Sequence, residues 1–277
     1  MERIRNAMEL AKISWRVLMK DRELLWLPVL SMAISLVVIG VFAALAFTMP
    51  GSTDAVTGEE QLSPAVAVIG ILGALALSVV AVFFNGALVA GAHERMTGGD
   101  PTVSSAIGRA SSHLGGLVPW ALLTATVGLI LQAIRERAGF LGNIVTSLAG
   151  AAWELITFLV VPAIIIDDLG AVDGIKRSGN LLRQTWGENI AARVGFGLLG
   201  FVAFIPLAIV VVLLAATGIT AMIVLAVIVA VVGIVLLSAV LTSLNAIFQT
   251  ALYLYATTGT VPSDFVGSSL PNSFAPK

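Results

Sequence analysis

The 277-residue sequence contains no cysteine, and only 11% of its residues carry a charge. Without cysteine there is no disulfide, no iron–sulfur cluster and no thiol nucleophile. A soluble domain has about 25% charged residues, so this chain has too few of them to cover a water-facing surface. Its formal net charge of -1 excludes the basic field that binds nucleic acid. Apolar residues make up 58% of the chain, with a mean hydropathy of +1.02, and this composition predicts a membrane protein.

Six apolar runs are long enough to cross a bilayer, because a helical span needs about 20 mostly apolar residues. These runs cover, approximately, residues 24–49, 64–92, 116–133, 143–166, 190–217 and 220–257. They are apolar on all sides rather than alternating, which favours helices over the strands of a barrel. The sequence predicts an all-α, polytopic membrane bundle of six transmembrane helices over residues 24–257, with an amphipathic helix at 1–23 and a cytoplasmic tail at 258–277.

The basic residues are distributed unevenly between the loops. Of the 15 lysines and arginines, all except Arg135 and Arg137 lie on one side of the predicted spans or just inside them. Because basic residues concentrate on the cytoplasmic side, we expect a multi-pass protein of the cell membrane with both termini in the cytoplasm. Five aromatic residues fall near the same ends of the spans, where their rings favour the interface: Trp26, Trp120, Trp186, Tyr253 and Tyr255.

Three segments on the predicted cytoplasmic face have the spacing of amphipathic helices. The first, residues 3–23, carries basic side chains on its polar face: Arg5, Lys12, Arg16 and Lys20. Its apolar stripe either lies in the membrane interface against anionic lipid or packs on the inner ends of the spans. The other two cover about residues 101–115 and 169–187, and we expect Asp100 to cap the former and the pair Asp167-Asp168 to cap the latter.

The second and third of these helices align without a gap. Ala106–Ala110 matches Gly174–Ser178, and Ser14 of the first helix occupies the position of Ser178. The segments Thr97–Pro101 and Thr258–Pro262 also resemble each other at the ends of their spans. These matches predict a threefold repeat of an amphipathic helix plus a transmembrane hairpin. Such repeats are parallel, unlike the inverted pair of many secondary transporters.

Three stretches, Ser14–Val29, Val161–Gly187 and Ala251–Lys277, together resemble an uncharacterised family of prokaryotic six-span integral membrane proteins, a domain of unknown function. The resemblance extends over nearly the whole chain and implies six spans and cytoplasmic termini, but no activity and no catalytic residues. A more distant likeness is to the membrane-embedded part of some glycerophosphodiester phosphodiesterases. This chain has no room for their soluble catalytic barrel, so that chemistry is not transferred.

Glu154 is the one carboxylate deep in a predicted span, about 16 Å from its start at about 1.5 Å per residue. Insertion of an acidic residue at that depth costs about 2.5–3.5 kcal/mol, so we expect its side chain to face the bundle. Three side chains are possible partners: Asn85, Thr124 and Thr126. Glu154 is then either a proton or cation site, or a neutral carboxyl group that orders the bundle.

Pro162 and Pro206 lie inside the fourth and fifth predicted spans, where each removes a backbone donor. A pair of broken helices can form a solute site, although such prolines also simply bend a span. For Asn85, Asn245 and Gln249 we expect interhelical hydrogen bonds.

Two further patterns predict packing or exposure rather than a site. The glycine pattern Gly195–Gly200 lies within a predicted span, so helix packing explains it better than a nucleotide. The same holds for the small residues Gly86, Ala87, Ala90 and Gly91. His93-Glu94 lacks the second histidine of a zinc motif, so we predict no metal.

The polar residues concentrate on the cytoplasmic face, which predicts a non-enzymatic scaffold or accessory protein without a cofactor. Its expected partners are membrane lipid and, beyond lipid, another membrane protein or a second copy of the chain. The candidate contacts are Arg5, Lys12, Trp15, Arg16, Lys20, Arg109, Lys176, Arg177 and Trp186. The alternative is a small-solute or proton-linked transporter that uses Glu154, Pro162 and Pro206.

Overall fold

The structure is a computed structural model that describes residues 2–49, 52–53, 60–61, 63–137, 139–185 and 204–266. Within these ranges it is helical apart from a short antiparallel ladder between β1 (Ser52–Thr53) and β2 (Glu60–Gln61). The all-helical prediction is therefore confirmed for the described part of the chain.

Five of the described helical segments are long and apolar enough to cross a membrane, which indicates a multi-pass membrane protein. They are η1 with α2 (Arg22–Leu25 and Trp26–Phe47), α3 (Pro64–Met96), α5 (Leu114–Arg137), α6 with α7 (Gly139–Ile156 and Val160–Asp167) and α10 (Thr220–Thr258). Of the expected span 190–217, residues 190–203 lie outside the described residues. The described part contains the apolar helix Phe204–Ala215.

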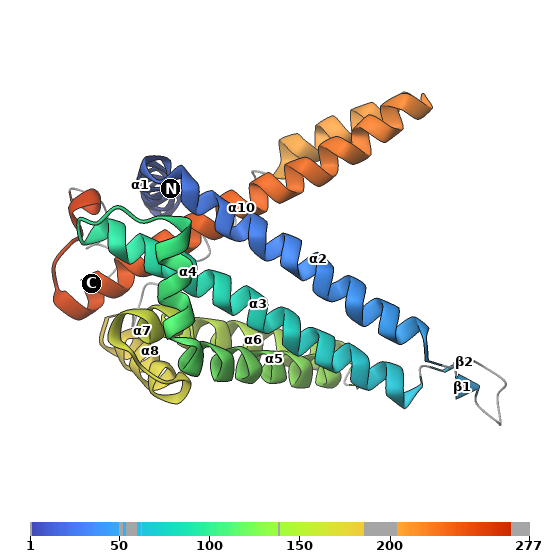
Figure 1. The fold of residues 1–277 in the computed structure, drawn as a ribbon, viewed down its shortest axis with the longest axis horizontal. Helices are drawn as coiled ribbons and strands as arrows, with labels where there is room; N and C mark the ends of the chain where they lie inside the picture. Colours follow the sequence, from blue (N-terminus) through green and yellow to red (C-terminus); the bar gives the residue numbers. More distant parts are fainter. Residues whose placement is uncertain are drawn as a thin grey trace.

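Three shorter helices precede the pairs of long ones: α1 (Glu2–Lys20), α4 (Val103–Ser112) and α8 (Ala171–Thr185). They gather at one end of the molecule with α7, the C-terminal ends of α3 and α10, and the start of α2 and α5 (Figure 1). We call this end the hub. From the hub, α2, α3, α5 and α6 extend in one direction, while the outer part of α10 and the helix Phe204–Ala215 diverge from them (Figure 1).

Helix α3 is the central element of the hub, because it contacts α2, α4, α5, α7 and α10. Its buried stretch lies in its C-terminal third and contains the small residues Gly86, Ala87, Ala90 and Gly91. A Cβ atom on Gly91 would come within 2.7 Å of the Leu24 side chain, and one on Gly86 within 3.0 Å of Leu117. Small residues at these positions let the neighbouring helices approach closely, as predicted.

The core lies at the end of the long helices rather than at their middle. At about 1.5 Å per residue, the 33 residues of α3 and the 39 of α10 give lengths of about 50 and 58 Å, against about 30 Å of hydrocarbon. The buried stretches of both helices fall near their C-terminal ends. Along the remaining length, large apolar side chains such as Leu36, Val37 and Val227 are exposed. Lipid is the environment in which such a surface is stable.

Helix α1 packs on the ends of the spans, but largely through another face than the predicted apolar stripe of Ile4, Ala7, Met8, Ala11, Trp15 and Leu18. Its buried apolar side chains are Leu10, Ile13, Val17 and Leu18. The stripe prediction is therefore wrong for Trp15, which is 43% exposed. Of the five aromatic residues expected at the interface, Trp120 and Tyr253 are buried. They lie near the hub ends of α5 and α10, and their depth in a membrane stays a prediction.

The caps of the second and third surface helices differ from the prediction. Thr102, not Asp100, caps α4, in a reciprocal capping box with Ser105. Asp168 does not begin α8 but ends α7, with a left-handed φ of 54°. Both differences arise because the acidic residues are engaged elsewhere in the hub, as described below.

The fourth span is interrupted between α6 and α7, over residues 157–159. Pro162 lies just after this interruption, and it cannot donate to the carbonyl of Phe158 four residues earlier. The hydroxyl group of Ser178 on α8 bridges the break: it donates to the Ile156 carbonyl at 2.5 Å and accepts from the Leu159 N–H at 3.1 Å. The predicted disruption of this span is therefore present, and a surface helix satisfies the freed backbone groups.

The adjacent glycines Gly115 and Gly116 provide a matched test of hub packing. A Cβ atom on Gly116 would lie 2.8 Å from Ile164 and 2.9 Å from the Leu169 carbonyl, whereas one on Gly115 would meet nothing within 4 Å. We expect Gly116→Ala to lower the free energy of unfolding by about 1–3 kcal/mol through overpacking. Gly115→Ala should leave it unchanged or raise it. Thermal unfolding of the purified proteins in detergent measures both, and equal midpoints would contradict the packing.

Candidate functional site

The structure does not gather the residues of the predicted intramembrane site. Glu154 is exposed on α6, and residues 190–203 of the expected fifth span lie outside the described residues, so the expectation that it faces the bundle stays a prediction. Pro162 is buried in α7, and Pro206 is exposed near the start of the helix Phe204–Ala215. On α3, the side-chain oxygen of Asn85 is buried and has no hydrogen-bond partner.

The expected partners of Glu154 are engaged with other groups. Thr124 accepts a hydrogen bond from the Trp153 indole at 3.4 Å, and Thr126 donates to the Leu122 carbonyl. Interhelical hydrogen bonds were also expected for Gln249 and Asn245. The Gln249 side-chain oxygen is buried without a partner, and Asn245 is exposed.

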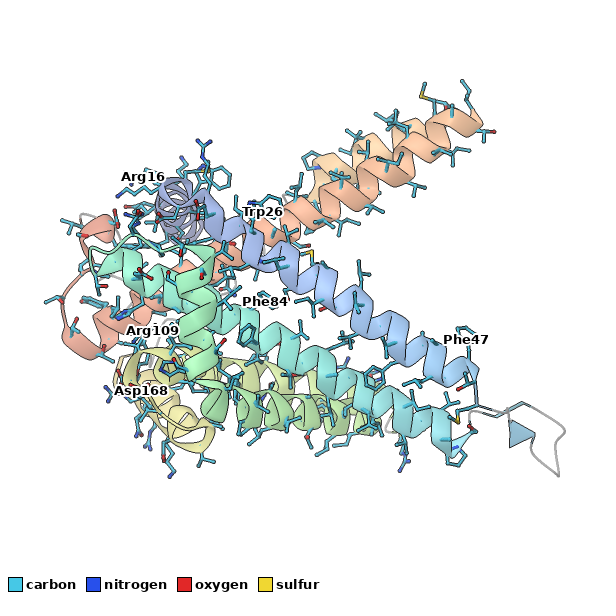
Figure 2. The ribbon with its side chains drawn as sticks, viewed as in Figure 1. Arg16, Trp26, Phe47, Phe84, Arg109 and Asp168 are labelled. Atoms are coloured by element: carbon cyan, nitrogen blue, oxygen red, sulfur yellow. The ribbon has the colours of Figure 1, made fainter. Side chains whose placement is uncertain are left out.

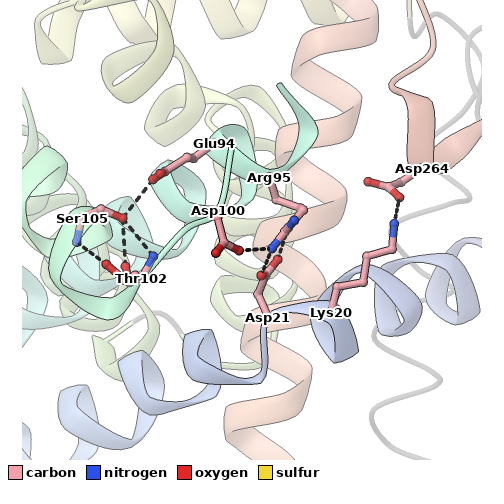
Figure 3. Close-up of polar contacts among 8 residues, drawn as sticks. All are labelled: Lys20, Asp21, Glu94, Arg95, Asp100, Thr102, Ser105 and Asp264. Carbon is pink, nitrogen blue, oxygen red and sulfur yellow. Dashed lines mark hydrogen bonds and ion pairs between the residues drawn. The ribbon is translucent and has the colours of Figure 1, made fainter. Parts of the chain in front are cut away.

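The interacting polar side chains are found in the hub rather than in the predicted intramembrane site. One group, the Arg95 cluster, joins the end of α1 to the end of α3 (Figure 3). The guanidinium group of Arg95 donates through two nitrogens to the buried carboxylate of Asp21, and through one of them to Asp100 at 2.8 Å. A bidentate arginine–carboxylate pair is among the stronger polar contacts in proteins. Asp100 is thus an ion-pair partner of Arg95 rather than the cap of α4.

Two further polar contacts near this cluster connect α1 to the segment after α10 and α3 to α4 (Figure 3). Lys20 at the end of α1 pairs with Asp264 in η2 (Ser263–Phe265), which holds the segment after α10 against α1. Glu94 accepts a hydrogen bond from Ser105 at 2.9 Å, so the capping box of α4 is tied to α3. The hub therefore connects its helices by charged contacts as well as by apolar packing.

A second group, the Tyr253 cluster, lies where α7, α8 and α10 meet. The hydroxyl group of Tyr253, a fully buried residue, donates to Asp167 at 2.5 Å, and Arg177 of α8 lies 3.5 Å from the same carboxylate oxygen. A hydrogen bond to the Tyr253 hydroxyl group raises the pKa of the Arg177 guanidinium group, and the negative charge of Asp167 raises it further. Asp167 is thus a bridge between α8 and α10 and not a helix cap.

Three more side chains border the Tyr253 cluster. The Nδ1 atom of His93 is buried and has no hydrogen-bond partner. Arg109 of α4 reaches the Ile165 carbonyl of α7 at 3.5 Å, and His113 lies 2.5 Å from the carboxylate of Asp168 (Figure 2 shows Arg109 and Asp168 at the hub). Within the described ranges, no three histidine or acidic side chains are placed to hold a metal ion.

The predicted contact residues separate into two kinds. Lys20, Lys176 and Arg177 form ion pairs with Asp264, Asp173 and Asp167 respectively. By contrast, the exposed side chains of Lys12 and Arg16 form no ion pair with any residue that the structure describes. The side chain of Arg5 and the whole of Trp186 lie outside what the structure describes.

Sequence reasoning missed Asp21, Arg95 and Tyr253 as organisers of the hub. Their partners lie 74 and 86 residues away along the chain, so no local spacing connects them. One signal was available in the sequence. Asp21 is an acidic residue between two basic neighbours at the end of an amphipathic helix, on the same predicted side of the membrane as the loop that contains Arg95.

A double-mutant cycle tests the Tyr253 cluster. We expect the Tyr253 hydroxyl group and the Asp167 carboxylate to couple by about 1.5–3 kcal/mol, because the hydrogen bond has a charged acceptor. The coupling is obtained from the unfolding free energies of wild type, Tyr253→Phe, Asp167→Asn and the double variant in detergent. Additive effects of the two substitutions would show that the contact does not stabilise the hub.

The chain was compared with known proteins, and no curated protein matches it. The distant likeness to the membrane part of phosphodiesterases therefore stays a prediction from the sequence. A family model described as a family of unknown function (DUF6159) matches residues 65–263, which include almost all of α3, the whole of α4 and α10, and the Tyr253 cluster. Because the match covers well over half of the chain, the protein belongs to this family of unknown function.

Proposed function

We propose that the protein is a non-enzymatic scaffold or accessory protein of the cell membrane, with six spans and both termini in the cytoplasm. In this proposal the hub lies on the cytoplasmic face and binds lipid or a membrane partner, which includes a second copy of the chain. The observation that carries the proposal is the polar face of α1, where Lys12 and Arg16 are exposed and unpaired among the described residues.

The placement of charge supports this orientation. The basic residues at the hub end whose side chains are described are Lys12, Arg16, Lys20, Arg22, Arg95, Arg109, Lys176, Arg177 and Arg183. Only Arg135 and Arg137, in the last turn of α5, lie at the opposite end of the described helices. An excess of lysine and arginine marks the cytoplasmic side of a membrane protein.

One regularity supports six spans built as a threefold repeat. The aligned positions of the surface helices are alike in burial, because Ser14, Ala110 and Ser178 are each at most 1% exposed. A repeated unit predicts this feature.

The packing of α1 favours binding at its polar face. Because Leu10, Ile13 and Leu18 are buried in the hub, the helix presents its basic side chains in a fixed arrangement. A pre-formed surface loses less conformational entropy on binding than a helix that must first fold or dock. A scaffold or lipid-binding role uses such a surface directly.

The alternative, a small-solute or proton-linked transporter, has less support. Of its three residues, Pro162 is buried in the core. Glu154 and Pro206 are exposed on two different helices. A transport site needs them to converge on one cavity near the membrane midplane. The transporter therefore remains an alternative drawn from the sequence alone.

Removing the basic face of α1 tests the proposal. We expect the variant Arg5→Gln/Lys12→Gln/Arg16→Gln/Lys20→Gln to lose association with anionic lipid and with membrane partners, because it lacks the charges that attract them. Lipid pull-down and in-membrane crosslinking measure the two associations. The control is Arg135→Gln/Arg137→Gln, which removes like charges at the opposite end. Unchanged associations in the α1 variant would refute the proposal.

A further inference from the structure

A shallow hollow of ≈ 490 Å³ lies beside α1, lined by Glu9, Lys12, Ile13, Trp15, Arg16 and Val266. It lies between the exposed side of α1 and the residue that follows η2. The ion pair between Lys20 and Asp264 and the fully buried Phe265 hold that segment against α1. The hollow therefore has two fixed walls.

The charge in this hollow is unbalanced. Lys12 and Arg16 are four residues apart, so their side chains lie on one face about one turn apart and repel each other. Neither forms an ion pair with a described residue, and the single carboxylate in the hollow belongs to Glu9. One positive charge is thus left uncompensated, which matches a ligand with one negative charge. An arginine and a lysine side by side suit a phosphate group.

The rim of the hollow is apolar and exposed. Trp15 is 43% exposed and Val266 is 73% exposed. Trp26, the first residue of α2, is 61% exposed and lies on the same side of the hub as Arg16 (Figure 2). Exposed tryptophans mark the headgroup level of a bilayer. If these tryptophans lie at the headgroup level, the two cations are within reach of lipid phosphates and the rim is within reach of the start of the acyl chains.

We propose that this hollow binds the headgroup of a phospholipid with one net negative charge, with Lys12 and Arg16 holding its phosphate and Trp15 and Val266 contacting the start of its chains. This inference rests on the proposed function and assigns its lipid partner to one place on the hub. The other basic residues of α1 and α8 then attract anionic lipid to the hub without binding the headgroup in this hollow.

Native mass spectrometry of the full-length protein in detergent tests the proposal, with phosphatidylglycerol as the anionic probe and phosphatidylcholine as the neutral one. We expect wild type to bind phosphatidylglycerol at least about tenfold more tightly, and Lys12→Gln/Arg16→Gln to weaken that binding about 30-fold. The charge-keeping variant Lys12→Arg/Arg16→Lys should retain binding. The matched control Arg135→Gln/Arg137→Gln removes two cations from the last turn of α5, away from the hollow, and should change binding less than twofold.

Three results would overturn the proposal. The first is unchanged phosphatidylglycerol binding in Lys12→Gln/Arg16→Gln, and the second is an equal loss in Arg135→Gln/Arg137→Gln. The third is displacement of the lipid by millimolar glycerol 3-phosphate, which would assign the site to a soluble phosphate. Should the fourfold variant lose lipid while the Lys12/Arg16 variant keeps it, this site fails and the scaffold proposal stands. Should neither lose lipid, both fail.

Discussion

The close packing around the C-terminal third of α3 is the constraint on which the other features of the structure depend. Gly86, Ala87, Ala90 and Gly91 give this segment a narrow surface, and five other helices contact α3. Between helices surrounded by lipid there is little hydrophobic driving force, whereas burial at the edge of the membrane removes apolar surface from water. The hub has the composition of a small soluble core, and the long helices project from it into lipid.

The charged contacts of the hub follow from this position. Near the membrane edge, helix ends expose unpaired backbone groups and the surface helices bring charged residues close together. Arg95 and Asp21 join α1 to α3, while Tyr253, Asp167 and Arg177 join α10, α7 and α8. Ion pairs within the described residues engage four of the hub cations: Lys20, Arg95, Lys176 and Arg177. Lys12 and Arg16 form no such pair and line a hollow, so they are available to an external partner.

The sequence predicts the elements of this fold better than their contacts. Helical periodicity and apolar length identify α1, α4, α8 and the long helices, because these properties are local. They do not decide which apolar face of α1 is buried, because the predicted stripe contained Trp15 and the structure buries Ile13 instead. The break after Ile156 was predicted only as a proline effect. The role of Ser178 in bridging it depends on a helix that follows later in the chain.

The candidate sites show the same limit. Glu154 was expected to face the bundle because a charge in lipid is costly; it is exposed on α6, and with part of the expected fifth span outside the described residues this stays a prediction. Asp100 and Asp167 have the sequence context of helix caps, but arginine and tyrosine partners bind them instead. A strong partner that is distant in sequence outweighs a local capping preference, and no spacing rule detects it. The basic face of α1, by contrast, depends only on local periodicity, and its described members Lys12, Arg16 and Lys20 are exposed.

The central claim is that the hub is a packed core on the cytoplasmic face, and cysteine labelling measures this most directly because the chain has no cysteine of its own. Ser111→Cys on α4 places a thiol at the hub, and Thr48→Cys places one beyond the far end of α2, both at exposed positions. With a membrane-impermeant maleimide, we expect the first to react only in inside-out vesicles and the second only in intact cells. Labelling of both from the same side, or with the sides reversed, would contradict the claim.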